Sequence, residues 1–335
     1  MGKLRMLENI QRTAAEPPFV AQINNAFIIG PLALFAGGDR NLNALDLQDL
    51  TVNPSFSTGI SGCIGTANLI TEAKRMRPGP YLALHGFRSN NFWHWMMEFL
   101  VKAALALEAG FKGNFIIPPN PSSLGFITES LKMLGVNPDN IVVYDGKPWW
   151  VEELVAPQYI NGHHEISLFP GLMGMLRDKL LASANAHGSA YRRIYLTRAK
   201  AVNARRVVNE AELWAALANF GFEQVVMEDL PLREQIRLAA SADCLVGPHG
   251  AGIVHCLFMP PGSLVIELIS SHYFNPCMFP VIDHLRHRYF MVPSPPIPGQ
   301  TDTCGDINAY IPMVEMTLRR ELEARAGLRQ ACRTD

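Results

Sequence analysis

The sequence contains no apolar run of about 18 residues, the length that a membrane-spanning helix requires. Its first residues are basic, but the apolar core of a secretory signal does not follow them. We therefore expect a cytoplasmic protein without a transmembrane segment, whose only contact with a membrane is peripheral.

Paired metal-binding or disulfide spacing is also missing. The six cysteines are scattered along the chain, a pattern that favours a reducing compartment. The pair His163-His164 has no third or fourth ligand at a suitable spacing. We therefore expect no metal site and no cofactor.

Positive and negative charges nearly balance, with a formal net charge of −1. Such a balance gives no general attraction to nucleic acid, so we expect no nucleic-acid partner. The 335 residues, 48% of them hydrophobic, suffice for two well-packed domains. One stretch contains no acid and is either a solvated face or a phosphate-facing surface. Its six basic residues are Arg192, Arg193, Arg198, Lys200, Arg205 and Arg206.

The most informative segment is a glycine-rich turn, residues 247–252 (GPHGAG). A short apolar strand, 243–247, runs into the turn, and the run 253–258 is typical of a helix. Such a turn leaves backbone N–H groups unpaired at the positive end of the helix, where an anion can bind them. Glycine lets a phosphate approach the backbone because it has no Cβ. Residues 263–268 predict a second buried strand, which carries Glu267.

The second half of the chain alternates between predicted strands and helices. Strands separated by helices of about ten residues form a parallel sheet with right-handed crossovers, which indicates a doubly wound domain. Ligands of such domains bind beyond the carboxyl ends of the strands, where Arg198, His249 and Glu267 fall. Asn209 is predicted to cap a helix, with Glu212 completing a capping box. The predicted strands are 194–196, 223–228 and 243–247, and the predicted helices are 210–220 and 232–241.

The first half alternates less clearly but predicts a second open α/β domain. Its expected strands lie within 26–35, 81–84, 114–118 and 141–144, and its expected helices are 91–110 and 126–134. The expected fold class is therefore α/β, with two Rossmann-like doubly wound domains. We place the domains at 1–168 and 169–310, followed by a terminal helix in 311–335 that packs back on the first domain.

One predicted helix carries a candidate catalytic pair. His94, Glu98 and Lys102 are spaced four residues apart in helix 91–110, so they share one face. A carboxylate within reach of an imidazole can orient it, as in a general base. The alternative is an exposed pair that stabilises the helix by only about 0.2–0.5 kcal/mol.

Two residues around the glycine turn also have two interpretations each. His249 either hydrogen-bonds the backbone or donates to a phosphate oxygen. Glu267 is either a core acid paired with arginine or a carboxylate that accepts from ribose hydroxyls. We favour the ligand-binding interpretation for both. Arg198 and Arg206 offer planar forks that suit a diphosphate.

Three blocks of this sequence together resemble glycosyltransferase family 61. Residues 247–268 (GPHGAGIVHCLFMPPGSLVIEL) are similar to the family's Gly-x-His-Gly-Ala-Gly turn, Pro-Gly and apolar strand ending in Glu. Residues 195–198 and 205–210 resemble its strand-Ser-Arg and Arg-Arg-x-x-Asn-Glu pattern, with Thr197 in place of Ser. Residues 91–98 (NFWHWMME) resemble its Asn-Tyr-x-His-Trp-x-x-Glu helix.

The resemblance implies a GT-B architecture, in which two domains face a cleft. It also implies inverting, metal-independent transfer of a sugar from a UDP-sugar to a hydroxyl of a glycan or lipid-linked saccharide. Bacterial relatives in the family suggest a role in surface polysaccharide synthesis. Glu98 or His94 would be the catalytic base. The implied donor-binding residues are Arg198, Arg205, Arg206, Asn209, Gly247, His249, Gly250, Ala251, Gly252 and Glu267.

Two other enzyme classes lack their sequence signatures here. A serine esterase requires a Gly-x-Ser-x-Gly elbow, which is absent. A nicotinamide oxidoreductase usually carries its glycine turn after the first strand, whereas this turn comes late. Among glycosyltransferases, the metal-binding architecture is disfavoured because no Asp-x-Asp occurs. A non-catalytic saccharide- or nucleotide-sugar-binding protein on a transferase fold stays open.

Overall fold

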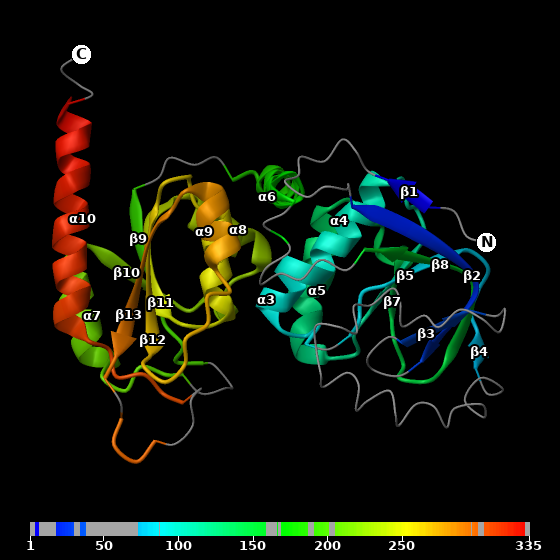
Figure 1. Ribbon diagram of the computed structural model, residues 1–335, viewed down its shortest axis with the longest axis horizontal. Coiled ribbons are helices and arrows are strands. Elements are labelled where there is room, and N and C mark those ends of the chain that lie inside the picture. The colour runs from blue at the N-terminus through cyan, green and yellow to red at the C-terminus, as the bar shows by residue number, and fades with distance from the viewer. Residues whose placement is uncertain are drawn as a thin grey trace. The chain divides into compact units, whose positions relative to one another are not determined.

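The computed structural model forms two compact units, Met1–Leu180 and Leu181–Asp335. Each unit has a β-sheet and a buried core of its own (Figure 1). The division falls within helix α6 (Pro170–Ala184), whereas the predicted domains meet at residue 168, and those domain limits stay predictions. The residues that the structure describes are 4–6, 18–29, 34–37, 73–86, 88–158, 166, 169–186, 191–200, 205–295, 297–300 and 305–331.

The first unit is built on an eight-stranded sheet of mixed direction. Its order is β1-β2-β8-β5-β6-β7, with β3 beside β2 and β4 beside β8. Strands β4 to β8 pair in parallel, as predicted for an α/β fold, but β2 is antiparallel to β1, β3 and β8. The antiparallel part differs from the doubly wound domain predicted for this half. The strands are β1 (Leu4–Met6), β2 (Phe19–Ile29), β3 (Leu34–Gly37), β4 (Lys74–Arg75), β5 (Pro80–Ala83), β6 (Asn114–Ile117), β7 (Ile141–Val143) and β8 (Trp149–Pro157).

Chain length between strands explains the mixed direction. Only four residues separate β2 from β3, positions 30 to 33, too few for the crossover that a parallel pair needs. The parallel strands β5 and β6 are instead joined through a helical segment that packs on β8. The helices of this unit are α3 (Phe92–His94), a π-helical turn (Trp95–Phe99), α4 (Leu100–Glu108), α5 (Pro121–Met133) and a 3-10 turn (Pro138–Asn140). The predicted helices 91–110 and 126–134 are confirmed with shifted ends.

The second unit is built on a five-stranded sheet that is parallel throughout, as predicted. Its order is β10-β9-β11-β12-β13. The chain therefore leaves β9 toward one edge and returns on the other side of β9 at β11. Such a reversal is a topological switch point, where ligands bind beyond the carboxyl ends of the strands. The strands are β9 (Arg192–Leu196), β10 (Phe222–Val225), β11 (Ala242–Pro248), β12 (Leu264–Ser270) and β13 (Arg288–Ser294).

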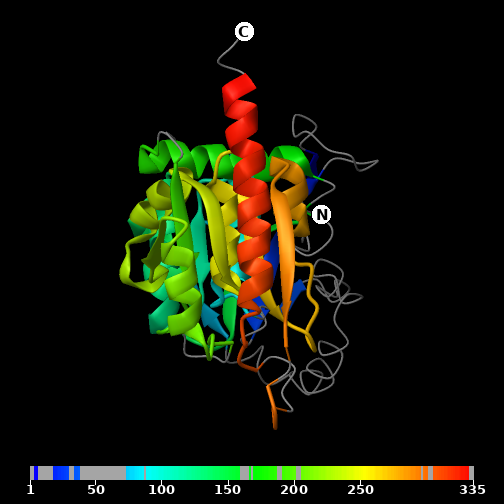
Figure 2. The same cartoon turned by 90° about the vertical axis from the view of Figure 1, so that its left-hand side faces the viewer.

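Helices cover both faces of this parallel sheet. Helices α7 and α10 lie on one face, and α8 and α9 lie on the other (Figure 1). Figure 2 shows α10 lying along the sheet, where its Val314 and Leu318 enter the core with Tyr195, Ile266 and Val292. The helices are α7 (Glu210–Ala218), a 3-10 turn (Met227–Asp229), α8 (Leu232–Ala240), the 3-10 helix η6 (Ala251–Phe258), α9 (Phe279–Leu285) and α10 (Ile311–Ala331).

The predicted capping box at Asn209 is wrong. Asn209 precedes α7, but its side chain caps no helical amide. Its Nδ2 donates to Ala309 O at 3.0 Å, and its Oδ1 accepts from Ala309 N at 2.8 Å. Because a backbone segment 100 residues away occupies both ends of the amide, the local capping contact does not form. The strand predicted over 223–228 also ends early, at Val225.

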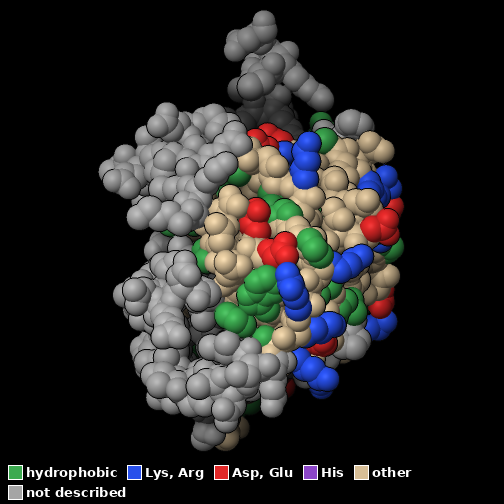
Figure 3. Space-filling model, turned by 90° about the vertical axis from the view of Figure 1, so that its right-hand side faces the viewer, with side chains coloured by type: hydrophobic (Ala, Val, Ile, Leu, Met, Phe, Trp, Pro, Cys, Tyr) green, Lys and Arg blue, Asp and Glu red, His purple; other side chains and the backbone are tan. Residues whose placement is uncertain are grey.

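The described surface mixes charges of both signs. On the face of the first unit seen in Figure 3, basic and acidic side chains are interspersed, in keeping with the net charge of −1. Within the described ranges, no helix combines the length and apolar character needed to cross a membrane.

Candidate functional site

The turn after β11 carries three adjacent amides without a partner in the described part of the chain. The preceding amide, that of His249, donates to Leu268 O at 2.7 Å. The next three amides, of Gly250, Ala251 and Gly252, meet no acceptor among the described residues. Unpaired N–H groups at the start of a helix are the donors to which anions bind.

Arg198 lies directly against this turn. Its guanidinium fills the space where a Cβ at Gly250 would lie. The backbone of Gly250 is extended, with φ 163°, so space rather than conformation requires glycine here. Burial and the charge of Arg205 lower the pKa of Arg198, and Glu228 opposes them. The positive charges of Arg198 and Arg205 therefore repel one another, and a bound anion would relieve that repulsion.

The segment around Arg205 is fixed by its contacts with a distant segment. Arg205 adopts φ 78°, a sparsely populated conformation for a residue with a Cβ. The Arg206 amide donates to Asp306 Oδ1 at 2.9 Å, and the Ile307 amide donates to Arg206 O at 2.8 Å. The side chain of Arg206 is exposed. Direct roles of Arg206 and Asn209 in donor binding stay predictions, because these contacts give them a structural function.

His249 and Glu267 form a buried pair below the turn. His249 Nδ1 lies 2.6 Å from Glu267 Oε1, and the two side chains are 4% and 0% exposed. Tyr289 donates to the other carboxylate oxygen of Glu267. The ring of His249 also meets the ring of Tyr273 edge-on, with centroids 5.3 Å apart. Because Glu267 is 0% exposed, its carboxylate is not accessible to a ribose in this arrangement, and direct contact between the two stays a prediction.

A small cavity adjoins the turn at the switch point. Its volume is about 30 Å3, which holds one or two waters. Sites for ligands of nucleotide size typically exceed about 300 Å3, so this cavity would have to widen before a nucleotide could bind in it. The lining residues come from the carboxyl end of β9, the segment after β10 and the glycine turn: Leu196, Thr197, Arg198, Met227, Glu228, Pro248, Gly252 and Ile253.

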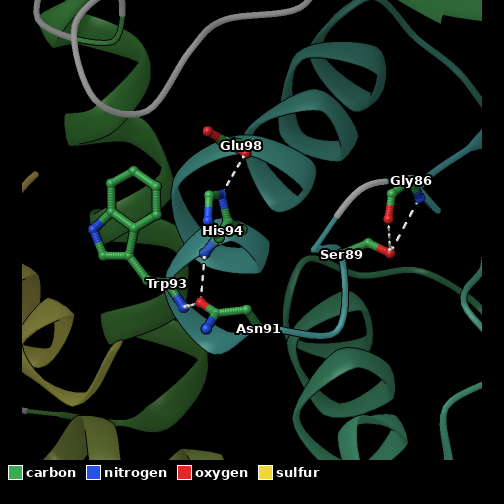
Figure 4. Close-up of polar contacts among 6 residues, drawn as sticks. All are labelled: Gly86, Ser89, Asn91, Trp93, His94 and Glu98. Atoms are coloured by element: carbon green, nitrogen blue, oxygen red, sulfur yellow. Dashed lines mark hydrogen bonds and ion pairs between the residues drawn. The ribbon is translucent and has the colours of Figure 1, made fainter. Parts of the chain in front are cut away.

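The second candidate site lies in the first unit, beyond the carboxyl end of β5. His94 Nδ1 lies 2.9 Å from Glu98 Oε2 on the same helical segment (Figure 4). The imidazole is 14% and the carboxylate 4% exposed, so this is not the exposed pair of the alternative interpretation. Asn91 begins the helix, because its Oδ1 accepts from the amides of Trp93 and His94 at 3.0 and 3.3 Å.

A π-helical turn holds this pair. Residues Trp95–Phe99 form the wider turn between α3 and α4, and all five are buried. Turns of this kind are frequently found at functional sites. Lys102, one further turn along, is buried as well, with its Nζ 5.2 Å from the centroid of the Phe99 ring. Burial lowers the pKa of Lys102 to about 8, against the opposing charge of Glu98.

Two residues near these sites carry no signal in the sequence. Tyr289 contacts Glu267 from the neighbouring strand β13, which a local pattern does not reveal. His85, after β5, is buried and stacks on Tyr144 with centroids 4.3 Å apart. His163 and His164 lie outside the described residues. Within the described ranges, no three His, Cys, Asp or Glu side chains gather as a metal site.

Several curated transferases are similar to part of this chain. An EGF domain-specific O-linked N-acetylglucosamine transferase of Drosophila melanogaster is 33% identical over 114 residues, 33% of this chain and 22% of that protein. A protein O-linked-mannose beta-1,4-N-acetylglucosaminyltransferase 2 of Xenopus laevis is 39% identical over 79 residues, 22% of this chain and 14% of that protein. A beta-1,2-xylosyltransferase of Oryza sativa subsp. japonica is 30% identical over 126 residues, 33% of this chain and 24% of that protein.

These matches extend over less than a quarter of each of the three relatives. The relatives come from animals and a plant, and they do not support the bacterial, surface-polysaccharide type that the resemblance suggested. The family model described as Glycosyltransferase 61 matches residues 92–266, slightly more than half of the 335 residues. The match begins one residue after Asn91 and includes the pair His94–Glu98, Arg198 and the whole glycine turn. The chain therefore belongs to glycosyltransferase family 61.

Proposed function

We propose that this protein transfers a sugar from a UDP-sugar to a hydroxyl group of a glycan or lipid-linked acceptor. The observation that carries the proposal is the group of three amides at residues 250–252 that meet no acceptor among the described residues, with the Arg198 guanidinium against Gly250. In this proposal the second unit binds the donor and the first unit binds the acceptor, in a GT-B architecture. Transfer inverts the anomeric carbon and needs no metal.

The donor side supplies charge stabilisation. Breaking the anomeric bond leaves negative charge on the diphosphate, and fixed donors aimed at that charge lower the barrier. The amides of the turn, Arg198 and Arg205 are such donors at the switch point between β9 and β11. Arginine suits this role because its planar fork binds two phosphate oxygens at once.

The acceptor side supplies the base. A base must take the proton of the acceptor hydroxyl as that oxygen attacks the sugar from the face opposite the leaving group. The contact between His94 Nδ1 and Glu98 favours His94 as the base, acting through Nε2, because Glu98 is 4% exposed and bound to the ring. Glu98 would then orient the imidazole and stabilise the imidazolium that forms.

The relatives indicate which sugars to test first. Their names specify transfer of N-acetylglucosamine and of xylose. UDP-N-acetylglucosamine and UDP-xylose are therefore the first donors for this chain. The acceptor in this proposal belongs to the synthesis of a surface polysaccharide.

Binding of UDP to the wild-type protein and to Arg198→Ala tests this function. Calorimetry and thermal unfolding should show that UDP binds and stabilises the protein more than GDP or NAD does. Arg198→Ala should weaken UDP binding by at least about tenfold, as expected for loss of a charged hydrogen bond. Arg192→Ala is the matched control, because Arg192 lies at the opposite end of the same strand in an exposed ion pair with Glu223. Equal stabilisation by every nucleotide would contradict the proposal.

Turnover separates an enzyme from a binding protein. The wild-type chain should release UDP from its donor, slowly to water and faster with an acceptor. Binding of the UDP-sugar without any UDP release, in the presence of a broad set of glycan acceptors, would instead indicate a non-catalytic nucleotide-sugar-binding protein.

A further inference from the structure

The carboxylate of Glu267 is fully buried and has two donors. Its Oε1 lies 2.6 Å from His249 Nδ1, and its Oε2 accepts from the hydroxyl of Tyr289. Glu267 is 0% exposed, so these two partners replace the water that would otherwise solvate its charge. A buried carboxylate stays ionised only where hydrogen bonds stabilise the charged form.

Three adjacent parallel strands bring these residues together. His249 follows β11, Glu267 lies on β12 and Tyr289 lies on β13. Tyr289 is in register with Val265. Because side chains alternate along a strand, Val265 and Glu267 share a face, and Tyr289 lies on that face too. The backbone of His249 is held as well, since its amide donates to Leu268 O.

The hydroxyl of Tyr289 acts as a donor in this arrangement. Burial and the charge of Glu267 raise the pKa of Tyr289, so the phenol keeps its proton. An ionised carboxylate only accepts, so the Nδ1 of His249 must carry a proton. No described residue hydrogen-bonds to His249 Nε2, which leaves that nitrogen for a ligand. A neutral ring protonated at Nδ1 has only a lone pair at Nε2 and therefore repels an anion at that nitrogen. To donate to an anion, the ring must carry a second proton, at Nε2.

Other titratable groups also face this pair. Burial raises the pKa of the Cys256 and Cys277 thiols, to about 12 for Cys277, so both thiols stay neutral near pH 7. The second proton therefore belongs to the histidine–carboxylate pair. The groups that face it are Cys256 from η6, Tyr273 and Cys277 from the segment after β12, and Tyr289 from β13. Of the nearby arginines, Arg198 lies against the adjacent Gly250, and the charge of Arg205 acts on Cys277.

We propose that Tyr289 is a positioning residue for the diphosphate site. Its hydroxyl holds Glu267 as a carboxylate, so the second proton goes to His249, and the imidazolium donates from Nε2 to a diphosphate oxygen. Without that hydroxyl, the proton moves to Glu267 and leaves a neutral ring. The ligand in this inference rests on the proposed function, whereas the proton positions do not.

Nitrogen NMR of histidine-labelled protein tests the proton positions without any ligand. On acidification, the wild-type His249 signal should change from protonation at Nδ1 alone to protonation at both ring nitrogens. In Tyr289→Phe, acidification should instead leave the ring singly protonated but move that proton from Nδ1 to Nε2, because the protonated Glu267 then donates to Nδ1. Tyr195→Phe is the matched control, because Tyr195 is a buried tyrosine of the same sheet whose hydroxyl donates to Glu210 Oε1 at 2.8 Å. It should leave the His249 signals as in the wild type.

UDP affinity measured from pH 5.5 to about 8.5 provides the functional readout. The terminal phosphate of UDP also titrates near pH 6, so the readout is the ratio of the variant's affinity to the wild-type affinity at each pH. Tyr289→Phe should bind UDP about tenfold more weakly than the wild type at the acidic end, as expected when a charge-assisted hydrogen bond becomes neutral, and equally well at the basic end. Unchanged His249 signals in Tyr289→Phe, or equal shifts in Tyr195→Phe, would overturn the inference.

A second variant keeps the test open if Tyr289→Phe fails to fold. Glu267→Gln retains the shape of the side chain and one acceptor oxygen, but it carries no charge to balance an imidazolium. Its His249 should stay singly protonated on acidification, and double protonation in this variant would refute the inference. If the wild type binds no UDP, the proposed function fails, while the NMR result still decides the role of Tyr289.

Discussion

The guanidinium of Arg198 occupies the space that a side chain at Gly250 would need. Gly250→Ala should therefore displace Arg198 from the turn and weaken UDP binding by about tenfold to a hundredfold, the loss expected for a charged hydrogen bond. Stability should change little, because the backbone at residue 250 is extended and the guanidinium is the mobile end of a long side chain. Calorimetric titration with UDP and thermal unfolding measure the two effects.

Gly262→Ala is the control for Gly250→Ala, because it should lower stability without changing UDP affinity. Gly262 adopts φ 75° with open space around it, so alanine should cost about 1–2 kcal/mol of stability through the left-handed backbone alone. UDP affinity should remain that of the wild type. Wild-type UDP affinity in Gly250→Ala would show that Arg198 does not serve the site.

The contact of His94 with Glu98 predicts unequal losses of turnover. His94→Gln should lower UDP release from the donor by about 10²–10⁴-fold, the usual contribution of a general base. Glu98→Gln should lower it less, because the base remains and only its orientation is weakened. UDP affinity should stay unchanged in both variants.

Glu108→Gln is the control for these two variants. Glu108 ends α4 and pairs with Lys179 at 2.7 Å, away from the imidazole. Turnover should remain near the wild-type value there. A larger loss in Glu98→Gln than in His94→Gln would make Glu98 the base instead.

Lys102 predicts a specific pH dependence of stability. Its pKa in the folded chain, about 8, lies below the ordinary value of 10.5. Between these values the unfolded chain binds more protons, so the contribution of Lys102 to stability rises with pH through this window. The full difference corresponds to about 3 kcal/mol, as an upper limit. Urea unfolding at pH 7, 8 and 9 should show a rise in the wild type that is smaller in Lys102→Met.

Lys132→Met controls for loss of a lysine as such, because Lys132 is exposed on α5. Its unfolding free energies should follow the wild-type pH dependence. Parallel curves for the wild type and Lys102→Met would mean that burial does not perturb this amine.

The two hydrogen bonds between Asn209 and Ala309 predict a structural role for the asparagine. Asn209→Ala should cost about 1–3 kcal/mol, because it leaves a backbone donor and acceptor without their partner. Asn219→Ala, at the exposed other end of α7, should change the unfolding free energy by less than about 0.5 kcal/mol. Equal stabilities of the two variants, with weaker UDP binding only in Asn209→Ala, would restore the ligand-binding interpretation.

Local patterns predict the parallel part of the fold well. The strands at 194–196 and 243–247 and the helix at 232–241 agree with β9, β11 and α8 to within two residues. The two strands are buried and apolar, and glycine or proline residues mark ends of β11 and α8. Such signals depend only on residues that are close in the sequence. The glycine turn and the His94–Glu98 contact are equally local, and both are present in the structure, although His249 pairs with Glu267, which neither interpretation of His249 predicted.

Contacts between distant segments escape such patterns. Tyr289 meets Glu267 because β13 happens to lie beside β12, and Asn209 meets Ala309 across 100 residues. The antiparallel pairing of β2 with β8 joins residues more than 120 positions apart in the same way. In each case the partner depends on strand order, which the period of hydrophobic residues does not specify.

The widened helical turn at Trp95–Phe99 makes the sensitivity of this helical stretch to chain length depend on position. It holds one more residue than an ordinary turn would, and the seven residues that follow, Leu100 to Ala106, are all buried. Deleting one residue of the widened turn would leave an ordinary turn, so the side chains of α4 would keep their directions. Deleting one residue within α4 would instead rotate all later side chains by about 100° around the helix axis, toward the wrong surroundings.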